Sequence, residues 1–502
     1  MRTPISSGKG RRFGTVGCGL ALLIFVSLIS GCGGSSQMSQ FHGTTQVMLL
    51  ATSTGGDEPF VFNIGSVSMS LQGESGEPVM VFDYPDCAGG VFATGPCLHL
   101  AFMGFNGGST PPLLTVTIAQ GIYTSATLTV NSCALELVGA GTLSLSTDSC
   151  GQGNGEVTVN FPAPITISGS SMALLLNLQV QQSYTLSGSG CAPGGNQNQC
   201  SFTISPVFTL TPFEIAAAPT NSQNGLVTEI LAQVQSVSAT GFTADSFYAG
   251  SLTFGTDAAT VFQGASGLSS LTASEFVELD AAIQPSGSLL ATRVEADDPT
   301  ALYMEDGVAA TGINTVLPSF DLAPAGGSIG TPMGFAEFTV TSDTAYKISG
   351  EFTNLSSLPF PATFNAQTMI GGQHVAALFS VSILASGYPH GPPVTTITLL
   401  PQVINGTVAS ISGSNGFTVY DVTLSPDDLI PSVQSVAGPD NNHLSDSTSV
   451  VVYASPDTQM LASSLPSVGS VERFRGLLFD DNGTLRMDCG QILDGASAPT
   501  TN

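Results

Sequence analysis

Two neighbouring segments read Leu114-Thr115-Val116-Thr117-Ile118 and Ala126-Thr127-Leu128-Thr129-Val130, with a turn that contains Gly121 between them. Apolar and hydroxyl side chains alternate in both, which is the pattern of a strand that buries one face. Residues 141–146 and 157–161 repeat this pattern, and Gly, Ser, Pro and Asn separate the segments. We therefore expect an all-β chain whose first domain is an antiparallel β-sandwich.

Patterns typical of helices or membrane spans are scarce in the rest of the chain. Leu226, Ile230 and Val234 have the spacing of one helix face, but we expect a strand over part of that segment. The longest apolar run beyond the N-terminus, Val375–Leu384, is too short to cross a membrane.

The N-terminus has the pattern of an export signal. Arg2, Lys9, Arg11 and Arg12 precede an apolar run over residues 19–29, and no acidic residue lies among them. A basic head before a short apolar run is typical of a signal that directs secretion and is then removed.

This run ends in Leu28-Ile29-Ser30-Gly31-Cys32, which resembles the lipobox of bacterial lipoproteins, although Ile29 stands where that family prefers Leu. The resemblance implies that residues 1–31 are a lipoprotein signal peptide and that Cys32 is acylated, with residues 32–43 as a tether. Two or more acyl chains anchor a protein stably. Gly33 directly after the cysteine is compatible with an outer-membrane location, so we expect a cell-envelope protein that faces the periplasm or the surface. An ordinary secretory signal beside a cysteine is the alternative.

The charge balance is strongly acidic. The 502 residues include 9 basic and 36 acidic ones, a net charge of −27, and 42% are hydrophobic. No Lys or Arg lies between Cys32 and Thr292, so we expect ion pairs to play no part in the first half of the mature chain. Nucleic acid is excluded as a partner because phosphate neutralisation needs clustered Lys and Arg. Divalent cations, basic partners or an acidic habitat suit such a surface.

Seven cysteines remain after the signal peptide and Cys32 are set aside. Six form near neighbours along the chain, which favours the disulfide pairs Cys87 with Cys97, Cys133 with Cys150, and Cys191 with Cys200. Six cysteines allow fifteen connectivities, so the pairing stays open. Metal binding is the weaker alternative, because the chain has no CxxC pair and only His99 lies near one of these cysteines. The seventh, Cys489, is either a buried free thiol or an intermolecular bridge.

Residues 44–215 hold the six candidate cysteines and form the expected β-sandwich. The run Gln120–Val130, together with Ser66–Leu71 and Glu77–Phe82, resembles the turn-and-strand elements of transthyretin-like sandwich domains in bacterial lipoproteins. The resemblance covers about half of this domain.

An internal repeat begins after residue 220. Val234–Ser238 followed by Gly241-Phe242-Thr243 matches Val408–Ser412 followed by Gly416-Phe417-Thr418. Further on, Thr256-Asp257-Ala258-Ala259 parallels Pro456-Asp457-Thr458-Gln459, with Thr341–Ala345 as a middle copy. We expect three β repeats at residues 225–300, 301–403 and 404–494. They resemble small-barrel repeats of uncharacterised bacterial lipoproteins, a resemblance that carries no activity.

Each repeat is expected to close with a hairpin. In the last repeat, Asp480-Asp481-Asn482-Gly483 separates two apolar segments, and Asn-Gly is a strong signal for a hairpin turn.

Motifs that would indicate catalysis are weak. The histidines are scattered, and we expect each in a loop or at the surface; they are His42, His99, His374, His390 and His443. The string Gly326-Gly327-Ser328-Ile329-Gly330 lies between Pro324 and Pro332 without a following helix, so it is interpreted as a loop and not as a nucleophile elbow.

Ligand-binding patterns are also weak. Asp440, Asn442 and Asp446 are calcium candidates on oxygen chemistry alone, and a solvated turn is the favoured interpretation. The chain has no Trp, and the tyrosines that could stack on a glycan show no spacing that singles them out; they are Tyr84, Tyr123, Tyr248, Tyr388 and Tyr420.

The sequence therefore predicts a lipid-anchored envelope protein without a cofactor, in a non-enzymatic binding, adhesion or scaffolding role. Its expected partners are the membrane, through the lipid, and an envelope protein or polysaccharide. The alternatives are a glycan-processing hydrolase that uses a carboxylate pair and a calcium-stabilised adhesin.

Overall fold

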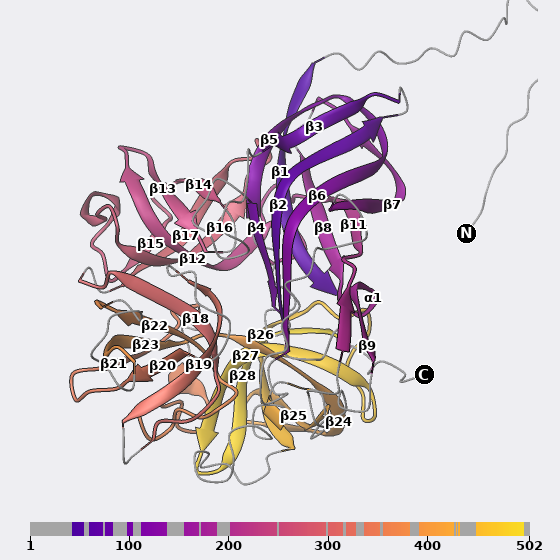
Figure 1. Ribbon diagram of the computed structural model, residues 1–502. Helices are drawn as coiled ribbons and strands as arrows, with labels where there is room; N and C mark the ends of the chain where they lie inside the picture. Colours follow the sequence, from indigo (N-terminus) through magenta and orange to yellow (C-terminus); the bar gives the residue numbers. More distant parts are fainter. Residues whose placement is uncertain are drawn as a thin grey trace, which may run out of the picture. The chain divides into compact units, whose positions relative to one another are not determined.

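The computed structural model describes residues 43–54, 60–73, 76–83, 98–103, 112–137, 155–169, 172–187, 201–247, 250–297, 300–314, 318–327, 336–351, 355–381, 391–425, 428, 430–431 and 448–495. Strands make up almost all regular structure in these residues (Figure 1). Helical structure is limited there to α1 (Val180–Ser183) and single turns such as η4 (Leu268–Ser270) and η5 (Leu355–Ser357). The all-β prediction is confirmed, and the segment from Leu226 is a strand as expected.

The first sheet has nine strands within the described residues, in the order β3-β2-β6-β7-β11-β8-β1-β5 with β4 paired to β2. They are β1 (Thr44–Thr54), β2 (Phe60–Gly73), β3 (Pro78–Asp83), β4 (Leu98–Met103), β5 (Pro112–Ala119), β6 (Gly121–Leu137), β7 (Glu156–Ile167), β8 (Met172–Gln179) and β11 (Phe208–Phe213). Strands β9 (Tyr184–Ser187) and β10 (Ser201–Ile204) form a separate pair. Most pairs are antiparallel, but β1 pairs with β8, and β7 with β11, in parallel.

One hydrophobic core fills the first sheet. The alternation in β5 and β6 buries Val116, Ile118, Leu128 and Val130 while their hydroxyl neighbours point outward. The strands at the two ends of the sheet order, β3 and β5, contact each other, so the sheet closes over this core.

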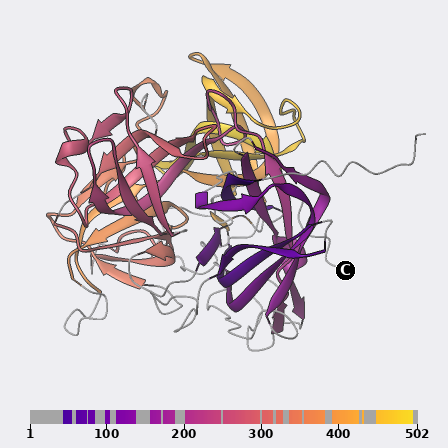
Figure 2. The ribbon, with the colours of Figure 1, turned by 90° about the horizontal axis from the view of Figure 1, so that it is seen from above.

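Three smaller sheets follow (Figure 2, magenta to yellow). The second contains β12 (Leu226–Val237), β13 (Gly241–Ser246), β14 (Ser251–Gly255), β15 (Val261–Gln263), β16 (Phe276–Ile283) and β17 (Leu289–Ala296). The third contains β18 (Tyr303–Ala309), β19 (Ser319–Gly327), β20 (Ala336–Thr339), β21 (Ala345–Ile348), β22 (His374–Phe379) and β23 (Val394–Leu399). The fourth is a closed barrel of β24 (Gln402–Ser414), β25 (Phe417–Leu424), β26 (Ser449–Met460), β27 (Val471–Asp481) and β28 (Thr484–Asp494).

These three sheets share one topology. The second has the order β14-β13-β12-β16-β17-β15 and the third has β20-β19-β18-β22-β23-β21, the same order shifted by six strands. In the fourth sheet the single long strand β26 pairs with β25 at its start and in parallel with β28. It therefore takes the positions that two separate strands, β14 and β15, occupy at the two ends of the second sheet.

A threonine hydroxyl closes each of the three sheets. Oγ1 of Thr260, Thr344 and Thr458 donates to the carbonyl oxygens of Ala291, Val394 and Cys489, at 2.8, 2.9 and 2.7 Å respectively. Each acceptor lies on the last strand of its sheet along the chain, β17, β23 or β28. The repeated Thr- and Asp-containing motif of the sequence therefore marks the segment that joins the two ends of each sheet.

The first repeat motif also marks a shared irregularity. The register of β12 against β13 shifts between Val234 and Ser236, and that of β24 against β25 shifts between Val408 and Ser410. The hairpin of the last repeat forms as expected, since β27 pairs with β28 around Asn482 and Gly483, both at positive φ.

The sheets share hydrophobic contacts with their neighbours along the chain. Met48 and Leu50 of β1 pack into the core of the second sheet. Leu231 and Phe276 of the second sheet pack with Met304 of the third. Leu477 and Phe479 of the fourth sheet join the core of the third, and these contacts set the frame for the polar network described next.

Candidate functional site

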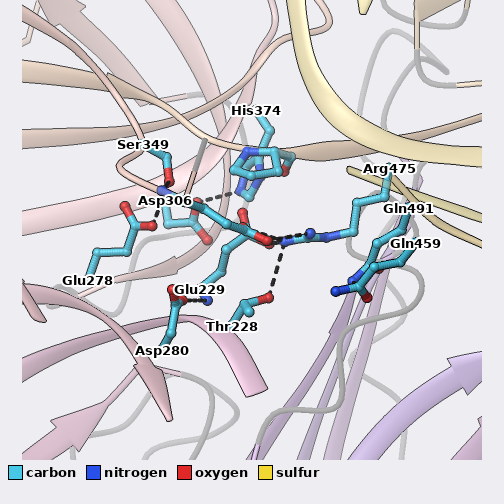
Figure 3. A network of polar contacts seen from close by, with 12 residues as sticks. Thr228, Glu229, Glu278, Asp280, Asp306, Ser349, His374, Gln459, Arg475 and Gln491 are labelled. Carbon is cyan, nitrogen blue, oxygen red and sulfur yellow. Dashed lines mark hydrogen bonds and ion pairs between the residues drawn. The ribbon is translucent and has the colours of Figure 1, made fainter. Parts of the chain in front are cut away.

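Arg475 joins side chains from three different sheets (Figure 3). Its guanidinium donates to Glu351 from Nη1 to Oε1 at 2.9 Å and from Nη2 to Oε2 at 3.0 Å. The same Nη2 forms an ion pair with Glu229 of β12 and lies 3.4 Å from Oγ1 of Thr228. Arg475 is only 1% exposed, and Glu351 follows β21. One buried cation thus holds the second and third sheets to the fourth.

Local irregularities in two strands turn these side chains toward each other. The register of β27 against β28 shifts between Arg475 and Gly476, and a Cβ on Gly476 would overlap the carbonyl oxygen of Asp488. Glu229 lies where the register of β12 against β16 shifts, with a φ of 57° that is costly for a residue with a side chain. Its N–H donates to Oδ1 of Asp280 at 3.2 Å, which supports this conformation.

A second arginine, Arg293 of β17, lies within the second sheet among three carboxylates. It contacts Glu278 at 2.6 Å, Asp280 at 2.7 Å and Glu295 at 2.9 Å. Glu278 and Asp280 lie two residues apart on β16, on the same face of the strand, and β16 pairs with β17. A cation on β17 therefore stabilises both of these buried charges.

Three consecutive residues after β21 connect the two arginine clusters. Ser349 Oγ donates to Glu278 at 2.6 Å, the N–H of Gly350 donates to Glu295 at 3.0 Å, and Glu351 binds Arg475. A Cβ on Gly350 would meet the side chains of Gln263 and Glu295, so this approach requires glycine. The segment brings the third sheet into both clusters.

His374 of β22 is fully buried beside Asp306 of β18. Its Nε2 lies 2.7 Å from Oδ1 of Asp306, and its Nδ1 lies 2.8 Å from the carbonyl oxygen of Pro401. Both partners are acceptors, so the geometry suits an imidazolium that donates from both nitrogens. Burial lowers the pKa of His374, but the charge and hydrogen bond of Asp306, the charge of Glu229 and the hydrogen bond to Pro401 together outweigh it, so that pKa lies above its ordinary value.

Burial also shifts the pKa values of the acidic side chains in the network. It raises the pKa of Glu229 to about 7 and that of Asp280 to about 6, against the opposing effects of Arg475 and Arg293. Burial alone raises the pKa of Asp488 on β28 to about 6. The thiol of Cys489 has a raised pKa for the same reason, so it is a poor nucleophile.

A pocket of about 600 Å³ lies beside Arg475 and is lined by residues of the second, third and fourth sheets. It opens where Ser455–Thr458 bulge out of β26, because the pairing with β28 jumps from Ala454–Cys489 to Gln459–Gln491. Its acidic lining residues are Asp280, Glu351, Asp457 and Asp488.

Several sequence predictions are corrected by these contacts. The prediction that ion pairs play no part in the first half of the mature chain is wrong, because Glu229, Glu278 and Asp280 pair with arginines that come later in the chain. The prediction that every histidine lies in a loop or at the surface is wrong for His374, which lies within a strand. Tyr123 and Tyr420 are buried and do not form a glycan platform.

Some of the residues for which the sequence predicted a role lie outside the described ranges. Cys32 lies outside them, as do the calcium candidates Asp440, Asn442 and Asp446. Cys133 is disulfide-bonded, but the other candidate cysteines lie outside the described residues, so the pairing stays a prediction; these are Cys87, Cys97, Cys150, Cys191 and Cys200.

The remaining predicted features are placed more fully. Gly326 and Gly327 end strand β19, and Ser328 lies outside the described ranges. Cys489 is a buried free thiol whose Sγ lies 3.2 Å from the carbonyl oxygen of Gln491. The described part of the chain contains no group of three or more His, Cys, Asp or Glu arranged for a metal ion. It also contains no helix long and apolar enough to span a membrane.

The sequence did contain one signal for the missed network. Only five Lys and Arg residues follow residue 31, namely Arg293, Lys347, Arg473, Arg475 and Arg486. Any of them that lies in an apolar strand is a candidate to neutralise buried acids. Arg475 and Arg293 both lie in such strands.

The fold defines an all-β protein with three barrel-like sheets of one topology. The model of a family described as a domain of unknown function, DUF5666, matches residues 233–295, which run from within β12 to within β17 of the second sheet. A search of curated proteins finds no match to the chain.

Proposed function

We propose that this chain is a lipid-anchored cell-envelope protein with a non-enzymatic binding or scaffolding role. The observation that supports this proposal most is that the two buried arginines are fully engaged in ion pairs with buried carboxylates. Arg475 is saturated by Glu229 and Glu351, and Arg293 by Glu278, Asp280 and Glu295. Arginines that are fully engaged in buried ion pairs hold neighbouring strands and sheets in a rigid arrangement and leave little for chemistry.

The anchor in this proposal is Cys32. The string Leu28-Ile29-Ser30-Gly31-Cys32 and the basic, apolar segment before it support acylation at that residue. A tether over residues 32–43 then holds the β-rich part near the membrane surface, at the outer membrane in this proposal. Labelled palmitate is expected to enter the full chain and not its Cys32→Ser variant, and equal labelling of both would contradict the anchor.

The binding role is tested with the mature chain, residues 33–502, immobilised and exposed to an envelope extract of its own source cells, with and without a calcium chelator. We expect a protein or polysaccharide to be retained saturably and to be displaced by excess free chain. Retention only with calcium would favour the adhesin alternative. No retention in either condition would contradict a binding role.

A second candidate, a glycan-processing hydrolase, is favoured by one observation. The pocket beside Arg475 is lined by several carboxyl groups, and burial raises the pKa of Asp488 to about 6, a value suited to a general acid. Hydrolysis of neutral oligosaccharides by the mature chain, lost in Asp488→Asn, would favour this candidate over the binding role.

A further inference from the structure

The pocket beside Arg475, called the pocket of the fourth sheet below, contains a buried hydrogen-bond acceptor that no described residue of the protein satisfies. Gln491 is 6% exposed and lines the pocket. Figure 3 shows Gln491 beside Gln459, and its Nε2 lies 3.4 Å from Oε1 of Gln459. Its own Oε1 is buried and has no hydrogen-bond partner among the described residues. A buried acceptor without a partner is costly, so a donor from a ligand would stabilise this site.

The charge around this acceptor is negative. Asp457 lies in the bulge of β26 and Asp488 lies on β28, and neither forms an ion pair within the described residues. The neighbouring cation, Arg475, is already shared by Glu229 and Glu351. The pocket therefore offers open acceptors and uncompensated negative charge.

The equivalent segment of the third sheet differs in one respect. There Asp343 lies in the matching Thr- and Asp-containing motif and lines a pocket of similar volume, about 610 Å³. That pocket holds its own cation, Lys347, which lies 3.1 Å from Asp297. The pocket of the fourth sheet is lined by carboxylates without such a lysine, so a cation from outside would take the corresponding role.

We propose that the pocket lined by Asp457, Asp488 and Gln491 binds an organic cation through a primary ammonium group. An ammonium group has three donors and no acceptor, which matches the carboxylates of Asp457 and Asp488 and the amide oxygen of Gln491, all of which are acceptors. The volume suits a small molecule, and Leu226 and Phe417 provide apolar wall for its carbon skeleton. A metal ion fits less well, because the described residues offer no group of three metal ligands. The inference rests on the proposed binding role and names its ligand class.

Isothermal titration of the mature chain, residues 33–502, tests the proposal with two sources of the ammonium group, spermidine and glucosamine. N-acetylglucosamine, which keeps the sugar skeleton and lacks the charge, is the matched control ligand. We expect saturable binding of at least one amine with one site per chain, and no binding of the acetylated sugar. Equal binding of glucosamine and N-acetylglucosamine, or no binding of either amine, would overturn the proposal.

Variants locate the site. Asp488→Asn is expected to weaken amine binding by about tenfold or more, the loss of one charge-assisted hydrogen bond. Gln491→Leu is expected to weaken it as well, and Asp343→Asn in the third sheet is expected to leave it unchanged. Thermal unfolding of each variant shows that it folds. A folded Asp488→Asn chain with unchanged amine affinity, or a chain that binds calcium in the amine's place, would overturn the proposal. Envelope capture that persists in a chain without amine binding would leave the proposed function standing and the pocket inference overturned.

Discussion

Nη1 of Arg475 lies 2.9 Å from Oε1 of Glu351, although 124 residues separate the two along the chain. Glu229, 246 residues away, binds the same guanidinium. The only cation at this point is therefore shared by acids of two other sheets within the described residues, and the geometry of each sheet depends on the other two.

The Gly476 position is expected to tolerate no side chain. A Cβ there would overlap the carbonyl oxygen of Asp488, so Gly476→Ala should force the β27–β28 pairing apart and lower stability by about 1–3 kcal/mol. Gly413→Ala in β24 is the matched control, because its nearest neighbour, the carbonyl oxygen of Phe417, lies 4.0 Å away. Urea unfolding measures both, and equal stability of the two variants would contradict the steric argument.

His374 is expected to make the free energy of unfolding fall as pH rises into the alkaline range. Its pKa is raised in the folded protein, so its contribution is complete below the ordinary value near 6.5 and is lost as pH rises through the raised value. His374→Gln leaves Asp306 buried without its cation, and we expect a loss of about 3 kcal/mol at pH 6 that shrinks at alkaline pH.

Urea midpoints of wild type and His374→Gln between pH 5 and 9 check this dependence. The double variant with Asp306→Asn should recover part of the loss, because it removes the unpaired charge. A His374→Gln penalty that is constant across this range would show that the ring is neutral in the folded protein.

Asp488 is expected to make the free energy of unfolding rise as pH falls into the acidic range. Its pKa is raised to about 6 by burial, while the unfolded value is near 4, so the folded state binds the proton more tightly between these values. Stability should therefore rise as pH falls from about 6 to 4. Asp488→Asn should be more stable than wild type at pH 7 and equal to it below pH 4.

Thermal unfolding of this pair of chains across pH 4–8 is the measurement. A wild-type stability maximum at neutral pH, unchanged by Asp488→Asn, would contradict both the effect of this residue and the suggestion of an acidic habitat.

The strands and the repeats could be predicted from sequence because their signals are local. Alternation over five residues defined β5 and β6, and Asn482-Gly483 specified the last hairpin. The match of Val234–Ser238 to Val408–Ser412 works because both segments carry the same register shift.

The polar network could not be predicted because its partners are distant in sequence. Nothing near Glu229 indicates Arg475, and the contact exists only once the sheets have packed. His374 offered a weaker clue, since it directly precedes the longest apolar run, Val375–Leu384, where a surface residue is least expected. The parallel pairs of the first sheet likewise depend on connections that no short pattern specifies.

The rigid-scaffold account is tested most directly by urea unfolding of residues 33–502 with Arg475→Met and Arg473→Met. Arg475→Met leaves Glu229 and Glu351 buried without their cation, so we expect a loss of about 3–5 kcal/mol. We also expect the wild-type sheets to unfold in one transition and the sheets of this variant to unfold separately. Arg473, on the same strand, donates to the carbonyl oxygen of Asp494 at an exposed site, and its replacement should cost less than about 1 kcal/mol. Equal, small effects of the two substitutions would contradict the claim that Arg475 holds the three sheets together.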